Sequence, residues 1–229
     1  RAKKMGIIQD IYQMPADTKQ EEVLALIDKL NADPEINGLM VQLPAPEQID
    51  ADALLKRIDP NKDVDALTPA NIGQLWMENH FVEPATAEGI IALLKHYQIT
   101  LAGKRVVVIG RSNIVGKPVA ALMLEENATV TVCHLYTKNL AEITRQADIV
   151  VSATGQAFLV TADMVKDGAV VVDVGMNHVN GKLVGDVDFD NVKEKASYIT
   201  PVPGGVGPLT VQFLMEAVVK LTRRQNGRE

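Results

Sequence analysis

The stretch from Val106 to Pro118 reads VVVIGRSNIVGKP. Its first four residues are apolar and β-branched, which favours a strand that is buried on both faces of a parallel sheet. Proline is accepted in the first turn of a helix, and the helix formers after Pro118 extend that helix to Glu125. Gly110 and Gly116 would let backbone N–H groups approach an anion at the start of the helix. The stretch therefore predicts a strand, a phosphate-binding turn and a helix.

The spacing of the two glycines does not by itself establish a nucleotide site. It reads G-x-x-x-x-x-G, whereas the usual dinucleotide fingerprint is G-x-G-x-x-G. Gly110 and Gly116 could equally make only a tight turn between a strand and a helix. The residues that follow favour the nucleotide site, because strand and helix patterns alternate over residues 129–133, 140–146, 149–153, 162–166, 169–174 and 198–199. This alternation predicts an α/β fold with a doubly wound, Rossmann-like parallel sheet.

The composition argues against several classes of partner. The 229 residues carry a net charge of −6 and only 4% are aromatic, whereas a nucleic-acid surface needs basic charge and rings that stack on bases. No apolar run is long enough to cross a membrane, and a single cysteine, Cys133, fits a reducing compartment. The four histidines lack the spacing of metal ligands. We expect a cytoplasmic protein that binds neither nucleic acid nor a membrane nor a metal ion.

The first part of the chain predicts a second, smaller α/β unit. Residues 6–12 and 38–42 have the composition of strands, and Thr18-x-x-Glu21 between them is a capping-box pattern that opens a helix. Together they predict a βαβ unit with parallel strands. Gln42 ends the second apolar run, and open α/β sheets bind their ligands at the carboxyl ends of the strands.

The segment after Gln42 is rich in proline and charge. Leu43-Pro-Ala-Pro46 predicts an extended exit from the sheet, and one of its X-Pro bonds could be cis. A short helix is expected over residues 52–57. The loop over residues 59–65 carries four charges, which fit a solvated turn when the loop is considered alone.

A helix that starts at Thr86, a residue suited to the N-cap, marks the boundary between two domains. We divide the chain into an N-terminal domain of residues 1–88, a dinucleotide-binding domain of residues 89–207 and a C-terminal helical segment of residues 208–229. The helix predicted over residues 209–223 has an apolar face that needs a partner, and the N-terminal domain is the simplest one. That face consists of Val211, Leu214, Met215, Val218 and Leu221.

Motifs along the whole chain resemble, in the same order, those of the bifunctional methylenetetrahydrofolate dehydrogenase/methenyltetrahydrofolate cyclohydrolase family. They are Val41-Gln-Leu-Pro44, Lys62-Asp-Val-Asp65, Gly110-Arg-Ser-Asn-Ile-Val-Gly-Lys-Pro118, Thr137-Lys-Asn-Leu140, Val172-Asp-Val-Gly175 and Thr200-Pro-Val-Pro-Gly-Gly-Val-Gly-Pro-Leu-Thr210. The resemblance implies a two-domain homodimer with the folate substrate between the N-terminal domain and an NADP-binding domain. It also implies hydride transfer from methylenetetrahydrofolate to the nicotinamide, followed by hydrolysis of the methenyl product.

The same resemblance assigns residues to the two ligands. Gln42, which would orient a catalytic lysine, and Asp65, which would accept hydrogen bonds from the pterin, are the expected catalytic residues. The expected folate-binding set is Gln42, Leu43, Pro44, Asp65, Pro203, Gly204 and Gly205. The expected cofactor-binding set is Gly110, Arg111, Ser112, Ile114, Val115, Gly116, His134, Thr154, Gly155, Gly175 and Thr210.

Cofactor preference depends on the end of the second predicted strand of the sheet. No Asp or Glu follows Cys133 before Glu142, so the usual acceptor for a ribose 2′-hydroxyl is absent, whereas Arg111 can meet a 2′-phosphate. NADP is therefore favoured. NAD stays open, because Leu135 and Tyr136 stand where the family often has a serine and a basic residue.

One expected motif has no match in these residues. In the family, the catalytic lysine belongs to a Y-x-x-x-K motif, and its position relative to Gly6 would place it before Arg1, so we expect the N-terminal domain to be incomplete at its start. Two alternatives remain open at this point. A different nicotinamide enzyme would explain the sheet, and a non-catalytic dinucleotide-binding protein would explain the missing motif.

Overall fold

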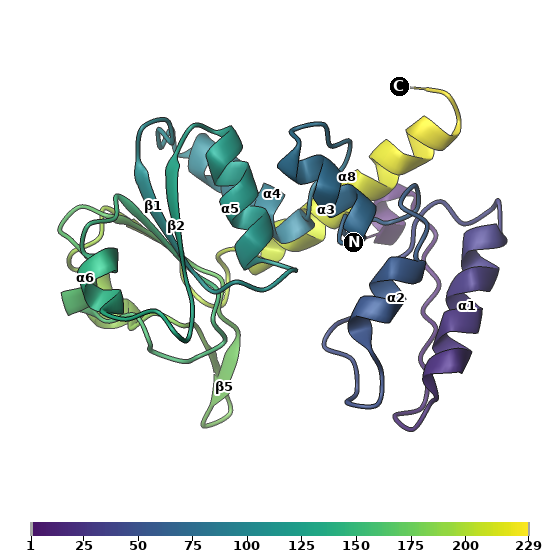
Figure 1. The fold of residues 1–229 in the computed structure, drawn as a ribbon, viewed down its shortest axis with the longest axis horizontal. Coiled ribbons are helices and arrows are strands. Elements are labelled where there is room, and N and C mark those ends of the chain that lie inside the picture. Colours follow the sequence, from purple (N-terminus) through teal and green to yellow (C-terminus); the bar gives the residue numbers. More distant parts are fainter. Residues whose placement is uncertain (1, 229) are drawn as a thin grey trace.

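A computed structural model describes residues 2–228 of the chain. The chain forms two lobes that share two long helices, α4 (Ala85–His96) and α8 (Gly207–Gln225) (Figure 1). The larger lobe contains a five-stranded parallel sheet in the order β2-β1-β3-β4-β7. Its strands are β1 (Arg105–Ile109), β2 (Thr129–Cys133), β3 (Ile149–Ser152), β4 (Val170–Asp173) and β7 (Tyr198–Ile199).

Both faces of the sheet are covered, because the central strands are almost continuous runs of valine and isoleucine. Val106 and Val108 pack in one buried cluster with α4 and α5 (Gly116–Glu125). Val107 and Ile109 point to the opposite face, where the cluster includes residues of the shorter helices. These are α6 (Leu140–Thr144), the 3₁₀ helix η2 (Ala162–Met164) and α7 (Phe189–Val192). The predicted doubly wound α/β fold is confirmed.

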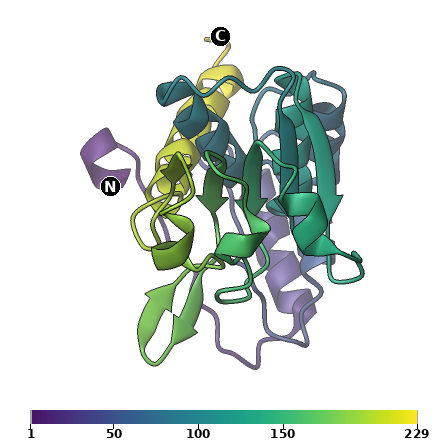
Figure 2. The ribbon, with the colours of Figure 1, turned by 90° about the vertical axis from the view of Figure 1, so that its left-hand side faces the viewer.

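The structure adds one hairpin that we did not predict. β5 (Asn177–Val179) and β6 (Lys182–Val184) pair antiparallel and project from the lobe (Figure 2). Asn180 and Gly181 connect them with φ angles of 51° and 76°. An Asn-Gly pair is the preferred two-residue hairpin turn, so the sequence did contain a signal for it.

The smaller lobe is helical in the part that the structure describes. It contains η1 (Ala2–Met5), α1 (Gln20–Ala32), α2 (Ala51–Arg57) and α3 (Pro69–Trp76). Ile27 and Leu30 of α1 are buried, and Ile27 packs with Leu54 and Leu55 of α2. The helix predicted over residues 52–57 is confirmed, whereas α3 was not predicted.

The two strands predicted in this lobe, residues 6–12 and 38–42, are wrong. A strand exists only when a neighbour supplies hydrogen-bonding partners. Ile8 and Ile11 are 93% and 79% exposed and pair with no described segment. Residues 38–42 make a single parallel bridge, between Leu39 and Asp63.

The two predicted N-caps are also wrong. Lys19 is the N-cap of α1 and Pro84 that of α4, and neither side chain caps its helix, whereas Thr18 and Thr86 had been expected in these places. The Thr86 hydroxyl is instead within 3.1 Å of the Thr210 hydroxyl, so it joins α4 to α8.

The loop over residues 59–65 is not a solvated turn. Lys62 and Asp63 are buried. The Lys62 ammonium donates to the carbonyl oxygens of Leu30, Asn31 and Asp33 at 3.1, 2.7 and 2.6 Å, which satisfies the end of α1. A cation at a helix C-terminus also interacts favourably with the helix dipole.

Lys62→Met should therefore destabilise the smaller lobe. Methionine keeps most of the side-chain volume but leaves three carbonyl oxygens without their donor, and we expect a loss of about 2 kcal/mol in the free energy of unfolding. Urea denaturation would measure it. Lys56→Met, at an exposed position in the last turn of α2, is the control and should change little. Equal stabilities of the two variants would contradict this role for Lys62.

Helix α8 packs back on the smaller lobe, as predicted. Leu221 is buried and Leu214 and Val218 are partly buried in a cluster that contains Val64 and Val82. Val211, expected on the same face, is exposed. Near the start of α8, Leu209 lies so close to Gly89 of α4 that an added Cβ at Gly89 would come within 3.0 Å of its Cβ, so the two helices need glycine there to approach.

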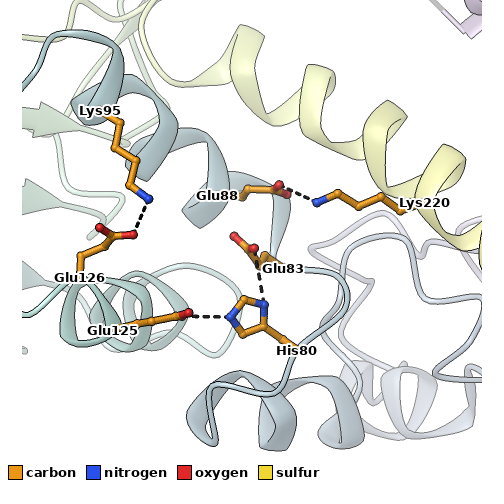
Figure 3. Close-up of polar contacts among 7 residues, drawn as sticks. All are labelled: His80, Glu83, Glu88, Lys95, Glu125, Glu126 and Lys220. Carbon is orange, nitrogen blue, oxygen red and sulfur yellow. Dashed lines mark hydrogen bonds and ion pairs between the residues drawn. The ribbon is translucent and has the colours of Figure 1, made fainter. Parts of the chain in front are cut away.

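Polar contacts fasten α4 and the segment before it to both neighbouring helices (Figure 3). Glu88 accepts from Lys220 of α8 at 3.0 Å, and Lys95 pairs with Glu126 just after α5. His80 lies between Glu83, at 3.5 Å, and Glu125 of α5, at 2.9 Å. These contacts link α4 and the segment before it to α5 and α8.

Candidate active site

The carboxyl ends of parallel strands meet at one edge of the sheet. The turn over residues 110–116 follows β1, His134 follows β2, Thr154 and Gly155 follow β3, and Gly175 follows β4. The loop that leads to Pro203, Gly204 and Gly205 follows β7. The structure thus brings the predicted cofactor-binding loops together with the loop over residues 200–206.

Both glycines of the turn after β1 are required by the protein's own backbone. Gly110 has a φ of +117°, and a Cβ there would come within 2.3 Å of the Ala153 carbonyl oxygen. A Cβ at Gly116 would come within 2.1 Å of the Gly110 carbonyl oxygen. The Ser112 hydroxyl accepts from the N–H groups of Val115 and Gly116 at 3.1 and 3.3 Å. The interpretation as a tight turn therefore accounts for both glycines, and the first N–H groups of α5 bond to Ser112.

Arg111 is the group in this turn that can reach an anion. Its side chain is exposed, and within residues 2–228 it has no hydrogen-bond or ion-pair partner. At the end of β2, the His134 N–H donates to the Thr137 hydroxyl and His134 Nδ1 accepts from the N–H of Tyr136. Tyr136 itself is 75% exposed. The edge thus offers a free guanidinium and an exposed ring, which suit the phosphate and the base of a dinucleotide.

Two buried carboxylates beneath these loops were missing from the predicted site. Asp173 ends β4 and accepts from the N–H groups of Gly175, Asp186 and Val187, each at 2.9 Å. Burial raises the pKa of the Asp173 carboxyl, and these backbone hydrogen bonds oppose the rise. Asp186 is fully buried. The only sequence signal was an Asp directly after a valine run and a Gly-Asp-Val-Asp segment, which by themselves indicate no role.

Asp65 lies at the start of α4. Its half-buried carboxylate accepts from the N–H of Ala85, the first residue of that helix. Burial, together with the negative charge of Asp63, raises the pKa of Asp65 to about 6, although the bond from Ala85 acts in the opposite direction. Thr86, in the same turn of α4, contacts Thr210 of α8.

The loop before α8 borders a cavity. Gly204 has a φ of +106° and open space where a side chain would stand, which fits the predicted approach of a ring. Gly205 differs, because a Cβ there would come within 2.6 Å of the Pro201 carbonyl oxygen. Both glycines line an apolar cavity of about 230 Å³ together with residues of α4, β4 and β7, and the Val202–Pro203 bond is cis.

Gln42, Leu43 and Pro44 lie on the smaller lobe. The Leu43–Pro44 bond is cis, in agreement with the prediction for this segment. Gln42 is exposed, and its Nε2 donates to the Leu43 carbonyl at 3.2 Å. No hydrogen bond between described residues joins Gln42 to Asp65. Leu39 and Asp63 form a parallel bridge. The segment that leads from Leu39 to Gln42 and the segment that leads from Asp63 to Asp65 therefore leave this bridge in the same direction.

Residues 2–228 contain neither a cluster of metal-binding side chains nor a membrane-spanning helix. No group of three or more His, Cys, Asp or Glu side chains is arranged to hold a metal ion. None of the helices in that range is both long and apolar enough to cross a membrane.

The fold and the site define a two-domain α/β protein with a Rossmann-like dinucleotide-binding lobe. Sequence comparison gives the particular family. The profile described as "Tetrahydrofolate dehydrogenase/cyclohydrolase, NAD(P)-binding domain" matches residues 84–226, and that of the "catalytic domain" matches residues 1–65. The chain belongs to the tetrahydrofolate dehydrogenase/cyclohydrolase family.

Individual relatives agree with this assignment. The chain is 86% identical to the bifunctional protein FolD of Lactobacillus acidophilus over 229 residues, which are 100% of this chain and 81% of that protein. The FolD structure of Campylobacter jejuni has a TM-score of 0.93 at 48% identity, covering 97% of this chain and 80% of that chain. FolD of Trypanosoma brucei, solved with NADP and an inhibitor, has a TM-score of 0.94 at 43% identity, with 100% and 80% covered.

Proposed function

We propose that this protein oxidises methylenetetrahydrofolate to methenyltetrahydrofolate by hydride transfer to NADP and then hydrolyses the product to formyltetrahydrofolate in one-carbon metabolism. Family membership supports the pair of reactions. The observation that carries the proposal is that the loops after the parallel strands meet at one edge of the sheet, with the exposed Arg111 guanidinium among them. The match to both domains of the family and the identity to a bifunctional relative do not favour a non-catalytic dinucleotide-binding protein.

The residues at the sheet edge fit a dinucleotide, which would supply the hydride acceptor when bound. Arg111 would pair with the 2′-phosphate, and Tyr136 offers an exposed ring beside it. The rest of the proposed cofactor set forms the surrounding loops: Gly110, Ser112, Ile114, Val115, Gly116, His134, Thr154, Gly155, Gly175 and Thr210. NADP use is supported by the match to the NAD(P)-binding domain and by the NADP-bound relative.

The folate would lie against the smaller lobe. Asp65, when ionised, can accept N–H groups of the pterin, and the space beside Gly204 lets a ring approach the backbone. Gln42 is proposed to orient the catalytic lysine, with Leu43, Pro44, Pro203 and Gly205 shaping the surroundings. These residues position the two rings, which is the main contribution a protein makes to hydride transfer.

Three further parts of the proposal concern organisation. We propose a homodimer, as the family resemblance implies, and a location in the cytoplasm, which the single cysteine supports. We also propose domain boundaries after residues 88 and 207. The two matched profiles, which end at residue 65 and begin at residue 84, support the first boundary.

The proposed function is tested by assaying both reactions. NADP-dependent formation of methenyltetrahydrofolate and its hydrolysis are each followed by absorbance, with NADP binding measured separately by calorimetry. Turnover in both assays is the expected result when this chain is preceded by the family's Y-x-x-x-K motif, because the hydrolytic step uses the lysine that Gln42 would orient. NADP binding without either turnover would favour the non-catalytic alternative.

Arg111→Ala should reduce the preference for NADP over NAD. An exposed guanidinium pairing with a phosphate contributes about 1.5–3 kcal/mol, so NADP affinity should fall about 10- to 100-fold while NAD affinity changes little. Calorimetry with both cofactors measures the ratio. Arg105→Ala, which removes the same side chain from the opposite end of β1, is the matched control. An unaltered ratio in Arg111→Ala would show that another group recognises the phosphate.

A further inference from the structure

Asp186 connects three separate segments beneath the cofactor loops. Its Oδ2 accepts from the Ser152 hydroxyl at 3.1 Å, the Thr154 N–H at 2.6 Å, the Thr154 hydroxyl at 2.9 Å and the Gly155 N–H at 3.3 Å. Its Oδ1 accepts from the Asn177 side chain at 3.0 Å. One carboxylate thereby holds the end of β3, the loop after it and the start of the β5–β6 hairpin.

Asp173 holds the same region from the other side. Its two oxygens accept the backbone N–H groups of Gly175, Asp186 and Val187, so the backbone of Asp186 is placed by Asp173 and its side chain places Thr154 and Gly155. This is a chain of buried hydrogen bonds from β4 to the loop after β3. Among residues 2–228, every buried side-chain nitrogen and oxygen has a hydrogen-bond partner. A movement of this network would therefore break existing hydrogen bonds.

Two glycines show how closely the backbone surrounds these carboxylates. A Cβ at Gly175 would come within 2.1 Å of Asp186 Oδ1, and a Cβ at Gly185 would come within 1.8 Å of Asp173 Oδ2. The glycines are therefore required by the carboxylates themselves. Gly175 belongs to the proposed cofactor set, but the closeness of Asp186 is enough to explain why this position is a glycine.

We infer that Asp186 is a positioning residue for the dinucleotide. It would fix the position of the Thr154–Gly155 loop relative to the turn at Gly110. That turn packs closely on the carbonyl of Ala153, the residue before Thr154. The inference rests on the proposed function only in naming NADP as the ligand. Asp186 is buried beneath the loop, so it acts through Thr154 and Gly155.

The test compares two substitutions at this position. Asp186→Ala leaves the four donors on Oδ2 unpaired, so the loop should shift and NADP affinity should fall about 10- to 100-fold. Asp186→Asn keeps an amide oxygen for the same donors, while the Asn177 amide can turn to present its own oxygen. Its NADP affinity should therefore fall less than about fivefold. Asp190→Asn, an exposed carboxylate on α7, is the control and should bind NADP like the unaltered protein.

Three readouts separate positioning from a general loss of structure. NADP affinity is measured by calorimetry. The folate KM and the hydrolysis rate are measured in the hydrolytic reaction, which needs no cofactor. Folding is measured by thermal melting. We expect NADP affinity, the KM for NADP and the melting temperature to change in Asp186→Ala, because its buried donors lose their acceptor, while the folate KM and the hydrolysis rate stay unchanged at temperatures where the variant is folded. Calorimetry requires no turnover, so a failure of the proposed activity would leave this test intact.

Two outcomes would overturn the inference. One is normal NADP affinity in a folded Asp186→Ala protein. The other is a parallel fall in NADP affinity, hydrolysis and melting temperature. If Asp186→Ala does not fold, Ser152→Ala removes one buried donor and should still weaken NADP binding about two- to fivefold with unchanged hydrolysis. Unchanged NADP binding in that variant would count against the inference.

Discussion

Asp65→Asn should stabilise the protein at neutral pH and at the same time remove most of its use of the folate substrate. Burial beside Asp63 raises the pKa of Asp65 to about 6 from an ordinary value of 3.8. The neutral form is therefore favoured by folding, and this stability is fully present below pH 3.8 and is lost as the pH rises through about 6. At pH 7.5 the ionised carboxylate is a cost to the fold, and asparagine removes it.

The size of the gain follows from the pKa. Each pKa unit corresponds to about 1.4 kcal/mol, and with solvent screening at this half-buried position we expect about 1–2 kcal/mol from Asp65→Asn. The asparagine oxygen can still accept the N–H of Ala85, so the start of α4 is preserved. Urea denaturation at pH 7.5 and pH 4 measures the effect. The gain should be present at pH 7.5 and largely absent at pH 4.

The loss of activity follows from the same charge. A carboxylate that accepts N–H groups contributes about 1.5–3 kcal/mol, so the folate kcat/KM of Asp65→Asn should fall about 10- to 100-fold while NADP affinity persists. In the unaltered protein, the folate KM should rise as the pH falls through about 6, and in Asp65→Asn this dependence should disappear. Asp52→Asn, exposed in α2, is the control. Unchanged stability and folate kinetics in Asp65→Asn would refute both the burial argument and the assignment of Asp65.

Gly110→Ala should abolish measurable NADP binding. The substitution adds a Cβ within 2.3 Å of the Ala153 carbonyl at a φ of +117°, which side chains rarely adopt. Steric overlap and backbone strain together should cost about 3 kcal/mol or more, and the turn can relieve them only by moving away from the loop after β3. That movement separates Arg111 from Thr154 and Gly155.

Gly103→Ala is the matched control, because Gly103 also has a positive φ, +74°, but nothing lies within 4 Å of an added Cβ. It should cost only about 1 kcal/mol and leave NADP binding intact. Thermal melting and calorimetry on both variants separate strain from overlap. Equal behaviour of the two would mean that the contact between Gly110 and Ala153 has no part in shaping the cofactor site.

The sequence by itself determined the larger lobe and most of the proposed site. Continuous valine runs broken by glycine and separated by helical patterns specify a parallel sheet, because the signal for each element lies within its own residues. The turn at Gly110, the loop after β3 and the loop before α8 then had to meet at the carboxyl edge. The return of α8 to the smaller lobe could be predicted for the same reason, from one apolar face.

Strand pairing, burial and pKa shifts depend on residues that are distant in the sequence, so only the tertiary structure decided them. Residues 6–12 have the composition of a strand but find no pairing partner among the described residues, and residues 38–42 pair at one residue only. Lys62 looks like a solvent-exposed charge until α1 ends beside it, and Asp65 has its raised pKa because folding buries it next to Asp63. Asp186 acquires its role from Ser152, Thr154 and Asn177. Pairing, burial and charge interactions are properties of residues brought together by folding, so local sequence patterns do not encode them.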